Sequence, residues 1–249
     1  MMADFKICRR VKGDIEEYRA NGPINIAVIG DSVSHGCVGG GISHDYNTVY
    51  HNRLRIMINK KYPTIPVNII NTAVGGTTAS FALGNFDRDV LPHTPDLAII
   101  CFGLNDVNGS MEDYSASLSG LFGKCRENGI DCIFMTPNML NTRYVEGTSE
   151  MYAEYARKTA EMQNSGKMDS FMEAARSTAE SCGVKVCDCY AKWKAMAADG
   201  IDTTLLLANY INHPTREMHK LFADMLYETI FGEKFVGENV IGNDGMIGF

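Results

Sequence analysis

Five short runs of apolar residues, rich in Ile, Val or Phe, constrain the fold of this chain more than any other feature. They cover residues 24–29, 67–70, 97–102, 130–135 and 184–187, and each is followed by a turn signal. None alternates cleanly between apolar and polar positions, which is typical of strands that are covered on both faces. The sequence therefore predicts a sheet of about five parallel strands between two layers of helices.

Helical stretches separate these runs. We expect helices over 47–60, 111–127 and 213–231, and a long one within 148–181. The β-α alternation has no linker or repeat, which favours a single domain over 1–249 with a doubly wound core at about 24–231. The Gly-rich tail, 232–249, is either a surface strap or partly disordered. Residues 140–170 either pack into the core or form a lid over the site.

Charge and composition exclude several classes of function. The 249 residues include 23 basic and 30 acidic side chains, a net charge of −7, which argues against a nucleic-acid partner. No apolar run approaches the roughly 20 residues of a membrane span, and no signal peptide is visible, so we expect a cytoplasmic protein. The eight cysteines are scattered, as reduced buried thiols are, and no histidine pair has metal-ligand spacing. We therefore expect no metal and no cofactor.

Ligands of such sheets bind at the carboxyl ends of the strands, so the polar segments that follow the runs are the candidate site. These segments are 30–32, 71–77, 103–106, 136–138 and Asp188, together with 209–214 before the last helix. The first loop, GDSVSHGCVGGG, matches neither phosphate-binding glycine pattern, and its Asp31 would repel an anion. A serine nucleophile displayed on a tight turn is the better interpretation of this loop.

Four of the segments occur in a fixed order: GDSVSHG, NTAVGGT, GLND and NHP. Together they resemble the four blocks of the SGNH hydrolases, the GDSL-type esterases, over roughly residues 24–231. The resemblance implies a three-layer α/β/α sandwich with flavodoxin-like strand order. It also implies an esterase that hydrolyses carboxylic esters through an acyl-enzyme, without a cofactor.

The resemblance assigns roles residue by residue. Ser32 matches the nucleophile and His213 the general base, which the weakly nucleophilic hydroxyl requires. The oxyanion hole is formed by the backbone N–H of Ser32, the N–H of Gly76 and the side-chain amide of Asn105. Gly75 replaces Gly76 if the loop is shifted by one position.

Short polar side chains beside these residues are expected to hold the loops in place. Asp31 and Asp106 have this supporting role, and Asn71 and Thr77 are expected to act similarly. His35 is either a substrate contact or a solvent-exposed turn residue.

The fourth block departs from the family, which usually has an Asp three residues before the base histidine. Tyr210 stands at that position. The role of orienting His213 then falls to a backbone carbonyl of 208–211, to the side-chain oxygen of Asn209, or to a remote carboxylate, Asp188 or Asp45.

These features predict an esterase for a small-molecule substrate, with an acetyl ester on a carbohydrate preferred. The alternatives are a lipase or thioesterase, or a carbohydrate-binding protein that has kept the pocket and lost turnover.

Overall fold

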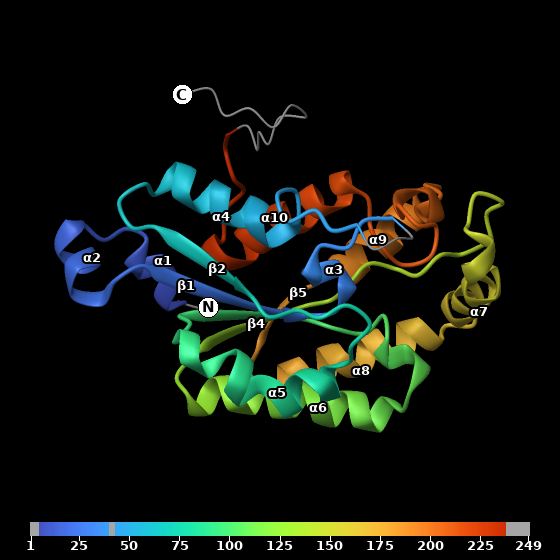
Figure 1. The fold of residues 1–249 in the computed structure, drawn as a ribbon, viewed down its shortest axis with the longest axis horizontal. Helices are drawn as coiled ribbons and strands as arrows, with labels where there is room; N and C mark the ends of the chain where they lie inside the picture. The colour runs from blue at the N-terminus through green and yellow to red at the C-terminus, as the bar shows by residue number, and fades with distance from the viewer. Residues whose placement is uncertain (1–4, 40–42, 238–249) are drawn as a thin grey trace.

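The computed structural model describes residues 5–39 and 43–237 of the chain. Its centre is a sheet of five parallel strands in the order β2-β1-β3-β4-β5 (Figure 1). The strands are β1 (Ile24–Gly30), β2 (Val67–Asn71), β3 (Leu97–Cys101), β4 (Asp131–Met135) and β5 (Lys185–Cys187). This is the flavodoxin-like order, in which the chain reverses direction across the sheet between β1 and β3. The predicted sheet is confirmed.

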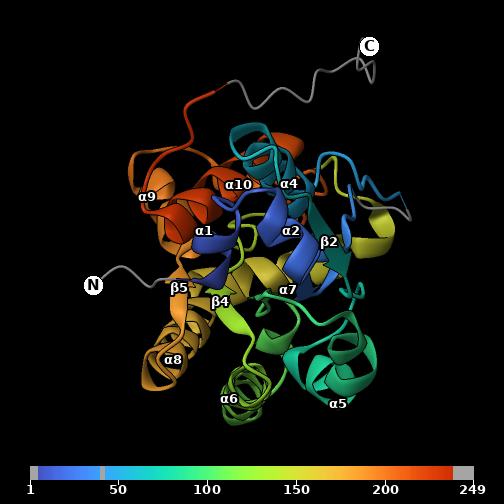
Figure 2. The same cartoon turned by 90° about the vertical axis from the view of Figure 1, so that its left-hand side faces the viewer.

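Helices cover both faces of the sheet. The α-helices are α1 (Lys6–Arg10), α2 (Ile15–Asn21), α3 (Ser32–His35), α4 (Tyr50–Lys61), α5 (Ala79–Asp89), α6 (Met111–Glu127), α7 (Ala153–Asn164), α8 (Lys167–Ser181), α9 (Cys189–Ala198) and α10 (Arg216–Phe231). The short 3-10 helices are η1 (Leu91–His93), η2 (Asp106–Asn108), η3 (Glu150–Tyr152) and η4 (Thr203–Leu206). In Figure 2, α4 and α10 lie on one face, and α5, α6 and α8 lie on the other. The protein is therefore a three-layer α/β/α sandwich.

Burial along the strands explains why the apolar runs lack alternation. Every residue of β3 is buried, and in β1 only Asn25 is partly exposed. These strands lie inside the sheet with helices above and below, so side chains on both faces enter the core. The edge strands β2 and β5 are partly exposed, in keeping with a solvent-facing edge.

The strand limits agree with the sequence prediction to within one residue, but some helices differ. The expected long helix within 148–181 is two helices, α7 and α8, separated where Gly166 adopts a left-handed φ of +80°. The sequence prediction also lacks α1, α2, α3, α5 and α9, of which α1 and α3, with five and four residues, are too short to show a helical period. In the tail, the ring of Phe235 packs edge-on against Tyr227 at 5.2 Å. The rest of the predicted tail, 238–249, lies outside the described residues.

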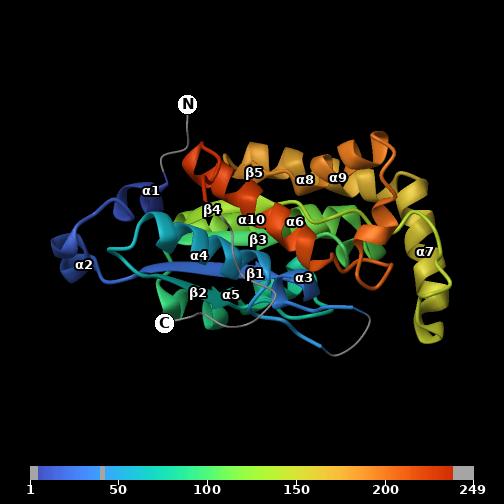
Figure 3. The same cartoon turned by 90° about the horizontal axis from the view of Figure 1, so that it is seen from above.

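Helix α7 lies at the end of the molecule opposite α1 and α2, as Figures 1 and 3 show. Its inner side is tied to the chain after β4 by the buried Asn141. That side chain donates to the carbonyl of Ala156 at 2.8 Å and accepts from the hydroxyl of Thr159 at 2.6 Å. This segment is therefore partly core. No helix in the described part of the chain combines the length and apolarity needed to cross a membrane.

Candidate active site

The parallel sheet brings three of the polar segments to one edge. Strand β1 pairs with β2 on one side and with β3 on the other, so the loops that follow these strands are neighbours. The loop after β2 is tied directly to β1, because the N–H of Val74 donates to the carbonyl of Gly30 at 3.1 Å. The segments predicted to form the site therefore meet at the carboxyl ends of the strands.

Ser32 begins the four-residue helix α3 directly after β1, and it is buried. Asp31 caps this helix by accepting the N–H of Val33 at 3.0 Å. The helix ends at Gly36, which has a left-handed φ of +99°, and a Cβ there would lie 3.3 Å from the carbonyl oxygen of Asp45. A glycine is thus required for the chain to turn away immediately after the serine.

His213 contacts Ser32 with one ring nitrogen and the backbone with the other. Its Nε2 lies 2.9 Å from Oγ of Ser32, and its Nδ1 lies 2.8 Å from the carbonyl oxygen of Gly39. A carbonyl can only accept, so Nδ1 carries the proton and donates it to Gly39. The Nε2 lone pair is then directed at the serine hydroxyl, which is the tautomer that a general base needs.

The loop before α10 holds His213 in place through its backbone. Oδ1 of Asn209 accepts the N–H groups of Ile211, Asn212 and His213 at 2.9–3.1 Å. Asn209 therefore supports the loop and does not contact the imidazole. Tyr210, at the position of the family's Asp, has a left-handed φ of +57°.

The partner of Nδ1 is a backbone carbonyl, as one alternative expected, but its predicted location in 208–211 is wrong. It comes from the loop after β1, about 170 residues earlier in the chain.

The two carboxylates that were alternatives for orienting His213 bond to other residues. Asp188 accepts from the Thr136 hydroxyl and pairs with Arg176, and Asp45 pairs with Arg216 at 2.7 Å. Neither carboxylate contacts His213.

The proposed oxyanion donors lie on the two neighbouring loops. Gly76 has a left-handed φ of +79°, and its N–H donates to no acceptor in the described residues. The N–H of Gly75 is already engaged, since it donates to Nδ1 of His35 at 3.2 Å. The amide nitrogen of Asn105 donates one hydrogen to the carbonyl of Thr77 at 2.8 Å. An amide has two hydrogens, so the second one of Asn105 is left for a ligand.

Buried carboxylates connect these loops. Asp106 accepts the N–H of Ala79 at 2.9 Å and that of Gly103 at 3.0 Å, which joins the loop after β3 to the start of α5. Burial raises the pKa of Asp106 above its ordinary value. Burial, reinforced by the charge of Asp106, raises the pKa of Asp31 to about 7, against the opposing hydrogen bond from Val33. Both predicted supporting residues are thus inside the site's framework.

The environment of His213 favours its neutral form. Burial lowers the pKa of its imidazole, the hydrogen bond to Gly39 partly opposes this, and the nearby His44 lowers it slightly further. No carboxylate is among these influences. The imidazole of His213 is therefore neutral at neutral pH.

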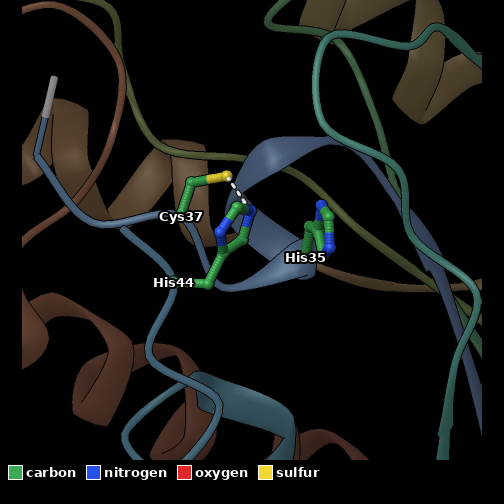
Figure 4. A group of neighbouring side chains, drawn as sticks. All are labelled: His35, Cys37 and His44. Carbon is green, nitrogen blue, oxygen red and sulfur yellow. Dashed lines mark hydrogen bonds between the residues drawn. The ribbon is translucent and has the colours of Figure 1, made fainter. Parts of the chain in front are cut away.

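A group that the sequence did not predict lies beside the nucleophile. His35, the last residue of α3, and Cys37 and His44 of the loop that follows bring two imidazoles and a thiol together (Figure 4). His35 is oriented toward the loop after β2, where its ring accepts from Gly75. The spacing His-x-Cys followed by a histidine seven residues later is not that of a known motif, so sequence alone gave little signal.

Comparison with known proteins places the whole arrangement in a family. A family model described as "GDSL-like Lipase/Acylhydrolase family" matches residues 28–221, more than half of the chain. An acetylxylan esterase from Geobacillus stearothermophilus is 24% identical over 134 residues. That match spans 46% of this chain and 59% of the relative's length.

Solved structures share the fold. The acetylxylan esterase from Geobacillus stearothermophilus superimposes with a TM-score of 0.66 at 19% identity, covering 86% of this chain and 97% of that one. An α/β hydrolase from the metagenome of Lake Arreo, Spain, gives a TM-score of 0.65 at 18% identity, covering 83% and 94% of the two chains. The family match covers the blocks that carry Ser32 and His213, and it shows that the chain belongs to the GDSL-like lipase/acylhydrolase family.

Proposed function

We propose that this protein is a serine esterase that removes a small acyl group, in particular acetyl from a carbohydrate, through a Ser32–His213 dyad. The observation that carries the mechanism is the hydrogen-bonded chain from Ser32 Oγ to His213 Nε2 and from Nδ1 to the Gly39 carbonyl. It joins a nucleophile to a base in the correct tautomer, and the base to a group that orients it.

The first half-reaction acylates Ser32. Oγ attacks the carbonyl carbon of the ester while its proton passes to Nε2 of His213. The tetrahedral intermediate then collapses, the bond to the alcohol oxygen breaks, and Nε2 returns the proton to the departing alcohol. In the second half-reaction, His213 takes a proton from water, the resulting hydroxide attacks the acyl-enzyme, and the acid leaves as Ser32 regains its proton.

Three donors support the negative charge that develops on the carbonyl oxygen. They are the backbone N–H groups of Ser32 and Gly76 and the free amide hydrogen of Asn105. Because the buried Asp106 and the Thr77 carbonyl fix the surrounding loops, these donors need little reorganisation when the charge appears.

The Gly39 carbonyl takes the orienting part of the Asp in a triad. It fixes the tautomer of His213 and the plane of its ring. As a neutral dipole, it stabilises the imidazolium less than a carboxylate would. We infer that the catalytic unit is a dyad with a backbone support.

The acyl preference rests on the relatives. Among solved structures of this fold, the one from Geobacillus stearothermophilus is an acetylxylan esterase, and its serine-to-alanine and aspartate-to-alanine variants are described as catalytic mutants. This chain has the serine in its first block but no acid in its fourth.

Replacing the nucleophile tests the mechanism first. Ser32→Ala should lower kcat for p-nitrophenyl acetate by about 10⁴- to 10⁶-fold, because nothing else in the site can accept the acyl group. The exposed Ser170→Ala on α8 is the matched control and should hydrolyse at the wild-type rate. A fluorophosphonate probe followed by peptide mapping should label Ser32, and a label on another serine contradicts the assignment.

The oxyanion hole predicts a different kinetic signature. Asn105→Ala should lower kcat by about 10²- to 10³-fold with KM nearly unchanged, because its contact forms mainly in the transition state. Asn105→Asp should be slower still, since it adds a negative charge beside the oxyanion. Asn85→Ala, an exposed asparagine on α5, serves as the control. An effect of Asn105→Ala on KM alone would make it a binding residue.

The dyad also predicts the pH profile. Because burial lowers the pKa of His213 and no carboxylate opposes this, the acidic limb of kcat/KM should titrate below about 6.5. Activity is full above that pKa and falls as the pH drops through it. Tyr210→Asp should move the limb upward if the new carboxylate displaces Gly39 from Nδ1, whereas Asp188→Asn should leave it in place. An acidic limb above 6.5 in the wild type, abolished by Asp188→Asn, would establish a displaced triad instead.

Acyl length is tested with a panel of p-nitrophenyl acetate, butyrate and octanoate, alongside acetylated xylo-oligosaccharides. We expect kcat/KM to be highest for the acetyl esters and acetate to be released from the sugars. A preference for octanoate would contradict the acetyl assignment and favour a lipase or thioesterase. Absence of turnover on all of them, with sugar binding retained, would identify a protein that binds without catalysis.

A further inference from the structure

The end of α3 and the loop that follows it carry a compact set of soft and borderline metal ligands. Sγ of Cys37 lies 3.2 Å from Nε2 of His44, and the ring of His35 lies 4.3 Å from the ring of His44, centroid to centroid. Figure 4 shows the imidazole of His44 between the thiol and the other imidazole. One ligand atom from each of the three side chains lies within 4.8 Å of the other two.

These separations are close to those around a tetrahedral metal ion. Bonds of about 2.3 Å to sulfur and about 2.0–2.1 Å to nitrogen place tetrahedral ligand atoms about 3.4–3.6 Å apart. The Cys37–His44 pair is already near this value, and no pair has to close by more than about 1.4 Å. A thiolate with two imidazoles is a donor set suited to Zn²⁺ and unsuited to Mg²⁺ or Ca²⁺.

The loop backbone holds the two arms of this set together. Cys37 and His44 face each other in an antiparallel bridge, and the N–H of Val38 donates to the carbonyl of Ser43 at 3.0 Å. The N–H of Cys37 donates to the carbonyl of Ser32, which ties the loop to the nucleophile's helix. Paired backbone therefore holds Cys37 and His44 opposite each other, which lowers the cost of organising the ligands.

The set also borders the catalytic serine. A Cβ built on Gly75 would lie 3.6 Å from Nδ1 of His35, 3.7 Å from Sγ of Cys37 and 3.6 Å from Cβ of Ser32. Two candidate ligand atoms and the nucleophilic residue thus surround one point. That point lies on the loop that also carries Gly76.

We propose that His35, Cys37 and His44 form a binding site for Zn²⁺, and that the bound ion inhibits ester hydrolysis at Ser32. The binding claim stands on the ligand geometry alone, whereas the inhibition rests on the function proposed above. Three protein ligands leave a fourth tetrahedral position for water.

Binding exchanges protons and one hydrogen bond. The thiol of Cys37 is protonated in the metal-free protein, because burial and the nearby Asp31 raise its pKa, so Zn²⁺ displaces that proton as the Zn–S bond forms. Nδ1 of His35 offers its lone pair to the metal and gives up the N–H of Gly75. No electron transfer is involved.

This exchange is the reason to expect inhibition. The loop after β2 loses the contact that fixes Gly75, next to the proposed oxyanion donor Gly76. A divalent charge held beside Ser32 also disfavours protonation of His213, which the reaction requires at its tetrahedral stage. The ion therefore acts on two parts of the catalytic unit while touching neither Ser32 nor His213.

Binding is tested on the full chain with Zn²⁺ alone, by calorimetry and by competition with a chromogenic zinc indicator. The wild type should bind one equivalent, and Cys37→Ala and His44→Gln should each bind about 100-fold more weakly, or worse. Cys182→Ala, at a partly exposed thiol outside the set, and His93→Gln, at an exposed histidine, should bind as the wild type does. Co²⁺ should give a thiolate-to-metal charge-transfer absorption that is absent from Cys37→Ala, and Mg²⁺ should not compete.

Stability gives a readout that does not depend on turnover. Zn²⁺ at about 100 times its Kd should raise the Tm of the wild type by about 5–10 °C and leave Cys37→Ala unmoved. No stoichiometric binding by the wild type, or undiminished binding by both Cys37→Ala and His44→Gln, overturns the site.

The inhibition is measured as the ratio of rates with and without Zn²⁺ for each protein separately. The wild type should lose most of its activity at one equivalent and regain it with a chelator, whereas Cys37→Ala should keep its own metal-free rate. If the wild type binds Zn²⁺ stoichiometrically and its rate of ester hydrolysis is unchanged, the proposed inhibition is wrong, while the proposed zinc site is supported. If the metal-free protein hydrolyses no ester, the proposed function is wrong. The zinc titration then still shows whether the zinc site exists.

Discussion

The parallel pairing of β1 with both β2 and β3 is the constraint on which the site depends. It sets the carboxyl ends of three strands side by side, so that loops separated by some 40 to 70 residues in sequence become neighbours. The loops can therefore be short, and each functional residue on them follows its strand within a few positions. The hydrogen bonds from Val74 to Gly30 and from Ala79 to Asp106 then fix the loops relative to one another. The sheet thereby supplies the rigidity that an oxyanion hole needs.

His213 comes from the C-terminal part of the chain, and a loop that does not follow a strand positions it. The side chain of Asn209 accepts three backbone N–H groups of the loop before α10, and a backbone hydrogen bond from Ala208 to His213 closes the same loop. The imidazole then bridges this loop and the one after β1. A carboxylate at Nδ1 would stabilise the imidazolium, whereas the Gly39 carbonyl fixes the ring without adding charge. Because the group at Nδ1 is uncharged, the protonated form of His213 is stabilised less, and the imidazole stays neutral over a wider range of pH.

The sequence predicts the sheet well because buried strands leave a strong local signal, as the fully buried β3 illustrates. The block motifs point to Ser32 and Asn105, which follow β1 and β3, and to His213, which precedes α10, and these roles stay predictions. Prediction from sequence fails for Gly39, because a backbone carbonyl has no side-chain signature and any residue carries one. It fails for His35, Cys37 and His44 as a group, because the antiparallel pairing of Cys37 with His44 brings them together and has no local sequence signal. The split between α7 and α8 depends on the left-handed conformation of one glycine among ordinary helix formers.

The hydrogen bond between His213 and Gly39 has a consequence for how this enzyme can change over evolution. A triad Asp can be lost through a single codon change, but a carbonyl oxygen persists through every substitution at its position. At position 39, with its left-handed φ of +67°, another residue costs about 1–2 kcal/mol of backbone strain and still offers the same oxygen. An insertion or deletion in that loop, by contrast, moves the oxygen away from the imidazole altogether. The length of this loop, more than the residue at position 39, therefore decides whether the hydrogen bond to His213 is kept.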